Sequence, residues 1–142
     1  MLRKQMIDDN GEIDLLARTI WGEARGEGYT GMKAVANVIM NRVQKGSWYG
    51  KTVQEVVLKP YQFSTWNAND VNRNKAANVD ETDTSFWTAK KIASLAYNGQ
   101  IDDITGGAIN YHSVGVNPYW ASEMEKTVQI GNHIFYKERA KA

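Results

Sequence analysis

Cysteine is absent from the 142-residue chain, and proline occurs only twice. Without cysteine there is no disulfide, no thiolate zinc site and no cysteine nucleophile, so any chemistry must come from oxygen and imidazole groups. Two prolines leave no proline-rich linker between domains. A chain of this length can bury a core without cross-links, and we expect a single domain.

Neither sign of charge dominates, because 17 lysines and arginines face 16 aspartates and glutamates, giving a net charge of +1. The charges are interspersed, which argues against a nucleic-acid partner. The longest apolar run, residues 34–40, is far shorter than the roughly 18 residues of a membrane span. The first residues also lack the apolar core of a signal peptide. We therefore expect no stable membrane association, and synthesis in a cytoplasm without a leader.

Apolar residues at helical spacing predict four helices. These are residues 14–24, residues 31–45, a short segment after Thr52, and residues 84–97. Thr30 is the expected N-cap of the second helix, and Gly46 is its expected stop. Residues 61–82 are polar and lack periodicity, so they predict a long functional loop.

The pattern changes after Gly107 to short runs of β-branched and aromatic residues. Residues 128–137 contain two such runs split by Gly131 and Asn132, as a tight hairpin turn would split them. The predicted fold class is therefore α+β and mostly α, a helical domain with a small C-terminal β-hairpin element.

The densest group of unusual residues is WGEARGEGY, residues 21–29, between the first two helices. Its three glycines disfavour a helix and predict a bend. Glu23 lies at the helix end, where the helix dipole and an apolar neighbour such as Trp21 favour a protonated carboxyl group. A protonated glutamic acid is what cleavage of a glycosidic bond requires. The alternative is that Glu23 and Glu27 are ordinary solvated charges.

Three blocks of the chain carry a resemblance to a known family. The string ARTIWGEARGEGYTGMKAVANVIMNRV, together with YQFSTWN and with INYHSVGVNPYWA followed by IGNHIFYK, resembles the SleB-type cell wall hydrolases, which include the spore cortex-lytic enzymes. The blocks occur in the family order and span most of the chain. The resemblance implies a lysozyme-like, lytic-transglycosylase-like helical fold. It makes residues 1–142 a single catalytic domain, with a family core over about 14–137 and terminal extensions at 1–13 and 138–142.

The resemblance also implies a glycosidase that cleaves the β-1,4 bond between N-acetylmuramic acid and N-acetylglucosamine in peptidoglycan glycan strands, by lytic transglycosylation or hydrolysis. It places the catalytic glutamate at Glu23. Glu27 is the second catalytic candidate, as nucleophile or base, if its carboxyl group lies about 5 to 9 Å from that of Glu23. Gly26 and Gly28 favour another interpretation, in which Glu27 leaves the helix and binds backbone donors at the start of the second helix. In that case Glu23 would be the single catalytic acid, and the reaction would be lytic transglycosylation.

Two segments rich in aromatic and polar side chains predict the walls of a saccharide groove. The candidate substrate-binding residues are Gln62, Ser64, Trp66 and Asn67 on the long loop, and Asn110, Tyr111, His112, Tyr119 and Trp120 on the other wall. Trp66 could instead anchor its loop to the core, and His112 could be a structural histidine. Tyr111 and His112 alternate in a strand, so only one of them can face a given side.

Other functions compete with this hypothesis. Two histidines without an HExxH pattern supply no recognised zinc set, so we expect no metal and no cofactor. A non-catalytic glycan-binding module would use the same aromatic residues but would have no use for a protonated acid. A binder of single-stranded nucleic acid would need a basic groove. A short domain without a leader is typical of a phage endolysin, and we expect a monomer that reaches the cell wall after release through a membrane hole.

Overall fold

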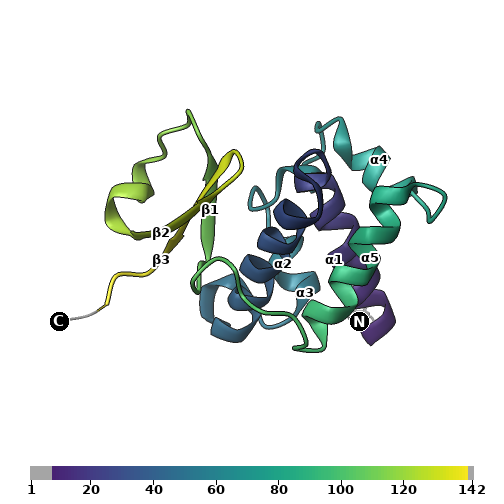
Figure 1. Ribbon diagram of the computed structural model, residues 1–142, viewed down its shortest axis with the longest axis horizontal. Helices are drawn as coiled ribbons and strands as arrows, with labels where there is room; N and C mark the ends of the chain where they lie inside the picture. The colour runs from purple at the N-terminus through teal and green to yellow at the C-terminus, as the bar shows by residue number, and fades with distance from the viewer. Residues whose placement is uncertain (1–7, 141–142) are drawn as a thin grey trace, which may run out of the picture.

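The computed structural model describes residues 8–140, which form a helical body with a small antiparallel sheet at its side (Figure 1). Within these residues the α-helices are α1 (Asp9–Ala24), α2 (Gly28–Lys45), α3 (Val53–Val57), α4 (Asn72–Asn78) and α5 (Thr84–Tyr97). The strands are β1 (Asn110–Ser113), β2 (Glu125–Ile130) and β3 (His133–Lys137). Short 3-10 turns are η1 (Arg25–Glu27), η2 (Ser47–Tyr49), η3 (Ser64–Trp66) and η4 (Tyr119–Glu123). The predicted class, α+β and mostly α, is confirmed.

Three predicted helix ends agree with the structure, and each has a clear capping residue. α5 begins after Asp83, whose side chain accepts a hydrogen bond from the Phe86 backbone N–H at 3.0 Å. α2 ends at Gly46, which has a φ of 64° and so adopts a conformation that favours glycine. The Thr52 side chain caps α3 through the backbone N–H of Glu55 at 3.1 Å.

Two predicted helix starts and one predicted loop are wrong. α1 begins at Asp9 rather than at residue 14, because Asp8 caps it, and α2 begins at Gly28, so Thr30 lies inside the helix. Residues 61–82 contain η3 and α4, so residues 8–140 hold five α-helices where four were predicted. α4 buries only Ala76, so its sequence has no apolar period from which to recognise it.

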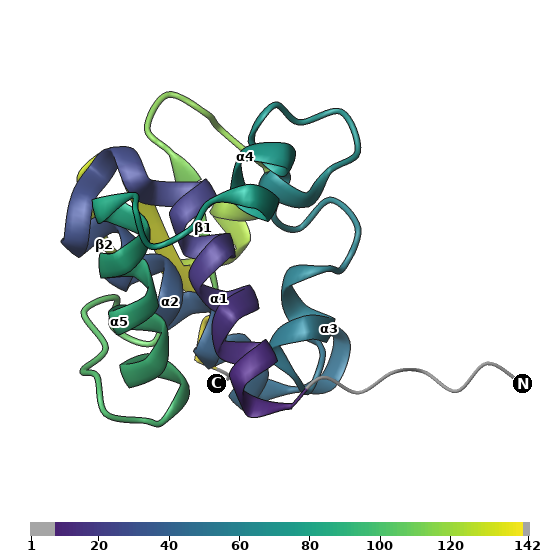
Figure 2. The ribbon, with the colours of Figure 1, turned by 90° about the vertical axis from the view of Figure 1, so that its right-hand side faces the viewer.

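α1 runs through the middle of the helical body, with α5 on one side and α3 on the other (Figure 2). It packs on α2, α3, α4 and α5, and therefore buries side chains around most of its circumference. Fully buried apolar side chains of α1, α2, α3 and α5 form the main core, among them Leu16, Ile20, Val35, Ile39, Val56, Phe86 and Ile92. Each contributes about 1.5 to 3 kcal/mol by leaving water. No helix within residues 8–140 has both the length and the apolar composition needed to cross a membrane.

The sheet has the strand order β1-β3-β2, with β3 antiparallel to both neighbours. The predicted hairpin is confirmed, and Gly131 takes a left-handed φ of 56° in its turn. Phe135 of β3 packs on Ala34 and Val38 of α2, so the sheet is held against the helix that follows Glu23 and Glu27. This packing brings the C-terminal strands to the end of α1.

α1 also supplies the acid that caps α3. The buried Glu12 carboxylate accepts hydrogen bonds from the backbone N–H groups of Val53 at 2.9 Å and Gln54 at 2.8 Å. Glu12→Ala should lower the free energy of unfolding by about 2 kcal/mol, because it leaves two N–H groups without their acceptor. Chemical denaturation measures this loss.

The matched control is Glu125→Ala, which removes a half-exposed carboxylate that lies 3.8 Å from Lys137. It should cost less than about 1 kcal/mol, as exposed ion pairs do. Equal losses for the two variants would contradict the capping role of Glu12.

Candidate active site

The predicted bend after the first helix is present and exposes Glu23 at its edge. Glu23 lies in the last turn of α1, and Ala24 leaves the helical conformation with φ −144° and ψ 15°. η1 follows, and Gly28, with φ 71°, turns the chain into α2. The Glu23 side chain is partly exposed at this junction, where another molecule can reach it.

Both oxygens of Glu23 accept hydrogen bonds from distant parts of the chain. Oε1 accepts from the Tyr111 hydroxyl on β1 at 2.8 Å. Oε2 accepts from the Thr65 backbone N–H at 3.0 Å, from the Thr65 hydroxyl at 2.6 Å and, at 3.4 Å, from the Ser64 hydroxyl. Within the described part of the chain, Glu23 forms no ion pair. The carboxyl group is thus oriented by neutral donors from the two predicted walls.

These donors indicate which oxygen of Glu23 can carry a proton. The Thr65 N–H can only donate, so Oε2 remains an acceptor in either protonation state. The Tyr111 hydroxyl can donate or accept, so Oε1 can be bare or protonated without losing its partner. This arrangement suits a group that gives up one proton and later takes one back.

Tyr111 is held in its protonated form. Burial, the charge of Glu23 and the hydrogen bond to Glu23 raise the pKa of Tyr111 well above its usual value of 10.0, and the charge of Glu27 adds to the effect. Its ring packs against His133 at 5.0 Å and Phe135 at 5.5 Å between centroids. At neutral pH the Tyr111 hydroxyl is therefore a fixed neutral partner of Glu23.

Thr65 belongs to the site although the sequence analysis did not select it. It lies between two predicted residues, Ser64 and Trp66, and is buried against α1. A Cβ atom added to Gly22 would lie 2.5 Å from Thr65 Cγ2 and 2.6 Å from its Oγ1. Gly22 is thus the glycine that lets Thr65 reach Glu23. In the sequence, a glycine directly before the candidate acid was the signal that another segment packs closely against this turn of α1.

Gln62 and Asn110, predicted on opposite walls, share one partner that the sequence analysis also missed. The Arg42 guanidinium donates to Asn110 Oδ1 at 2.7 Å and, through a longer contact of 3.5 Å, to Gln62 Oε1. Arg42 follows Val35 and Val38 on the buried face of α2. In the sequence, Arg42 could have been selected as a charged residue on the buried face of the predicted helix.

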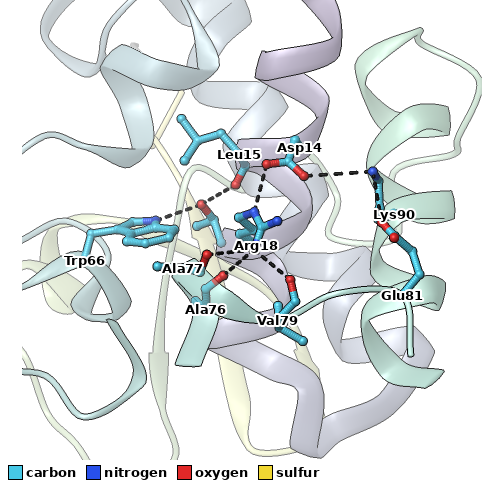
Figure 3. Close-up of polar contacts among 10 residues, drawn as sticks. Asp14, Leu15, Arg18, Trp66, Ala76, Ala77, Val79, Glu81 and Lys90 are labelled. Atoms are coloured by element: carbon cyan, nitrogen blue, oxygen red, sulfur yellow. Dashed lines mark hydrogen bonds and ion pairs between the residues drawn. The ribbon is translucent and has the colours of Figure 1, made fainter. Parts of the chain in front are cut away.

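Trp66 anchors its loop to the helical body, as the alternative interpretation allowed. Its indole N–H donates to the Thr19 hydroxyl at 2.9 Å, and Thr19 donates in turn to the Leu15 carbonyl at 2.7 Å (Figure 3). Asn67 closes η3 through its backbone N–H, which bonds the Ser64 carbonyl at 2.9 Å. The predicted sugar contacts of Trp66 and Asn67 stay predictions.

His112 lies on the face of β1 opposite Tyr111, so the strand brings Tyr111 to Glu23 and turns His112 away. His112 Nε2 lies 2.9 Å from the Tyr136 hydroxyl, and its ring lies 5.7 Å from that of Trp120. Tyr119 is 86% exposed in η4. His112, Trp120 and Tyr136 thus form an aromatic group on the face of β1 opposite Tyr111. The predicted sugar contacts of His112, Tyr119 and Trp120 stay predictions.

Glu27 is tied to the hairpin turn, and its predicted partners are wrong. It occupies the N-cap position of α2 but makes no side-chain hydrogen bond to that helix. Its carboxylate instead accepts from the Asn132 backbone N–H at 3.1 Å and pairs with His133 Nδ1 at 3.1 Å. A side chain on Gly131 would collide with Glu27, so the turn needs glycine for this approach.

Residues 8–140 contain no group of three histidine, cysteine or carboxylate side chains that could hold a metal ion. The groups gathered at Glu23 are its own partly exposed carboxyl group, the buried Tyr111 hydroxyl and the Thr65 hydroxyl. These groups can transfer a proton to or from a molecule in front of Glu23 Oε1.

Residues 26–136 match the protein family described as Cell Wall Hydrolase. The chain is 35% identical over 127 residues to the spore cortex-lytic enzyme of Bacillus cereus, and 32% identical over 127 residues to that of Halalkalibacterium halodurans. Each alignment covers 89% of this chain, but 44% and 34% of the respective relatives. The chain thus spans less than half the length of these curated relatives.

Two solved structures resemble the whole described fold. The catalytic domain of the germination-specific lytic transglycosylase SleB from Bacillus anthracis has a TM-score of 0.71 and 31% sequence identity, and the match covers 95% of this chain and 100% of that domain. The catalytic domain of the Bacillus cereus SleB protein has a TM-score of 0.72 and 32% identity, with 94% of each chain covered.

The contact between Gly22 and Thr65 leads to a stability prediction. Gly22→Ala should lower the free energy of unfolding by about 1 to 3 kcal/mol, the range for overpacking a tight site, because the new methyl group displaces Thr65. Gly26→Ala is the matched control, since a Cβ atom at Gly26 meets no atom within 4 Å. Thermal unfolding followed by circular dichroism compares the two. A Gly22→Ala protein as stable as Gly26→Ala would show that Thr65 moves aside without cost.

Proposed function

The chain belongs to the cell wall hydrolase family, and from this premise we propose that it is a lytic transglycosylase acting on peptidoglycan. The family resemblance carried by the sequence motifs and the lytic-transglycosylase-like fold are confirmed. The proposed reaction cleaves the β-1,4 bond between N-acetylmuramic acid and N-acetylglucosamine. The observation that carries it is the single carboxyl group of Glu23, partly exposed and held by Tyr111 and Thr65.

Glu23 performs two proton transfers in this reaction. Its protonated Oε1 first gives a proton to the glycosidic oxygen, so that the N-acetylglucosamine residue leaves as a neutral alcohol when the bond to muramic acid C1 breaks. The resulting carboxylate then takes the proton from the C6 hydroxyl of the same muramic acid, whose oxygen bonds to C1 and closes a 1,6-anhydro ring. Glu23 ends the cycle protonated, and no water is consumed.

The position of Glu27 supports a mechanism with one acid. A two-carboxylate glycosidase needs its second carboxylate free to attack the sugar or to activate water. The Glu27 carboxylate is already bound by the Asn132 N–H and by His133. Its task is to hold the β-hairpin against η1, and the proposed products are accordingly anhydro-muramic ends.

The groove walls supply binding groups for the acetamido sugars. Ser64, whose hydroxyl lies 3.4 Å from Glu23 Oε2, and Gln62 on the same loop offer hydroxyl and amide groups for this binding. Asn110 lies on the face of β1 opposite Tyr111, where its amide group is bound by Arg42 and Met124, so its contact with sugar stays a prediction. Peptidoglycan glycan strands are the substrate of this proposal. The roles as phage endolysin and as monomer, and the release from a host cytoplasm onto the cell wall, stay predictions.

Loss of the acid tests the function directly. Glu23→Gln keeps the shape of the side chain but cannot supply the proton, so digestion of purified peptidoglycan should fall by a factor of at least about 10². Mass spectrometry of wild-type digests should show anhydro-muramic ends, which are lighter by one water than reducing ends. Glu125→Gln, on the exposed face of the hairpin, is the control and should digest at the wild-type rate.

A folded Glu23→Gln protein that still releases products would overturn the assignment of Glu23. A wild-type protein that binds peptidoglycan and releases no fragments would favour the non-catalytic binding module.

Glu27→Gln separates the two mechanisms. It should lower the free energy of unfolding by about 0.5 to 2 kcal/mol, because it weakens the ionic hydrogen bonds to the hairpin turn. The folded fraction should keep most of its activity, as measured by product release per folded molecule. A stable but inactive Glu27→Gln protein, or digests with reducing ends alone, would instead favour a two-carboxylate muramidase. The control is Glu138→Gln, which removes an exposed pair with Lys45.

A further inference from the structure

Arg42 of α2 is a buried cation, and the residue is only 5% exposed. Its Nε donates to the Ile109 carbonyl at 2.6 Å, and its two terminal nitrogens reach Asn110 and Gln62. One guanidinium therefore joins the segment leading into β1 to the loop that carries η3.

All of these acceptors are neutral. Within residues 8–140 no carboxylate forms an ion pair with Arg42, and the sides of its guanidinium are covered by the rings of Tyr49 at 5.2 Å and Phe63 at 5.1 Å. A buried charge without an ionic partner carries a desolvation cost that a methionine or leucine would not. Core packing alone therefore does not account for an arginine here.

Burial lowers the pKa of Arg42, while electrostatic interactions with Tyr111, Tyr49 and Glu23 oppose that shift. A guanidinium remains charged even when its pKa falls, so Arg42 is a permanent positive charge in this environment.

We propose that Arg42 is a positioning residue of the transglycosylation site: its guanidinium ties the segment leading into β1, which carries Tyr111, to the loop of η3, which carries Thr65, so that both donors meet at Glu23. The inference rests on the proposed function, because it assumes that Glu23 is the acid that these two donors orient. Arg42 touches neither substrate nor the reacting atoms.

Two substitutions separate charge from geometry. Arg42→Gln removes the positive charge, and Arg42→Lys keeps it but cannot bind Ile109, Asn110 and Gln62 together. The matched control is Arg18→Gln on α1. Arg18 also donates to backbone carbonyls, those of Ala76, Ala77 and Val79, and so lies against α4 and the residue that follows it (Figure 3).

Both Arg42 variants should lower kcat on soluble glycan strands by about tenfold or more and leave KM nearly unchanged, because the two segments that orient Glu23 lose their common support. Arg18→Gln should lower Tm and change neither kcat nor KM.

A second readout does not depend on activity. The backbone amide signal of Thr65, which bonds Glu23 Oε2 and is identified by its change in Glu23→Gln, should shift in Arg42→Lys and stay in place in Arg18→Gln. Wild-type kcat and an unchanged Thr65 signal in a folded Arg42→Lys protein would overturn the positioning role, even if Arg42→Gln did not fold. An inactive wild-type protein would refute the proposed function, while the Thr65 signal would still decide whether Arg42 positions the donors of Glu23.

Discussion

The hydrogen bonds on Glu23 join three parts of the chain that lie far apart in sequence. Thr65 is 42 residues from Glu23, and Tyr111 is 88 residues away, yet both donate to its carboxyl group. For Thr65 to do so, the residue before Glu23 must be glycine, because Thr65 occupies the space of a side chain there. For Tyr111 to do so, β1 must pack beside α2. The bend after α1, the η3 loop and the sheet therefore all meet at one acid.

Much of this fold was predictable where the sequence carries a local signal. The apolar period of residues 84–97, the cap at Thr52 and the Gly131-Asn132 turn each depend on neighbouring residues, and each was predicted in its observed place. α4 was not predictable in this way, because it is short and buries one alanine. Its position comes from packing against α1 and η3, which no local pattern records.

The same division applies to the site. The pattern of a glutamate among glycines at a helix end singled out Glu23, and the family resemblance made it the catalytic candidate. Tyr111 was selected as an aromatic residue of a sugar groove, and its hydrogen bond to Glu23 was not predicted. Thr65 and Arg42 depend on contacts between distant segments, so the sequence indicated their neighbours rather than the residues themselves. Glu27 was assigned to the start of α2, but the hairpin turn, 105 residues later, offers the Asn132 N–H to the same carboxylate.

The route of the chain has a consequence for the order in which the protein is assembled on the ribosome. Glu23 belongs to α1, whereas Tyr111 lies on β1, Asn132 in the hairpin turn and His133 on β3, all of which are translated later. Until those segments emerge, the polypeptide carries Glu23 without the hydroxyl that orients it or the turn that secures the bend beside it. The proposed site is thus completed only after the helices that form its base have been made.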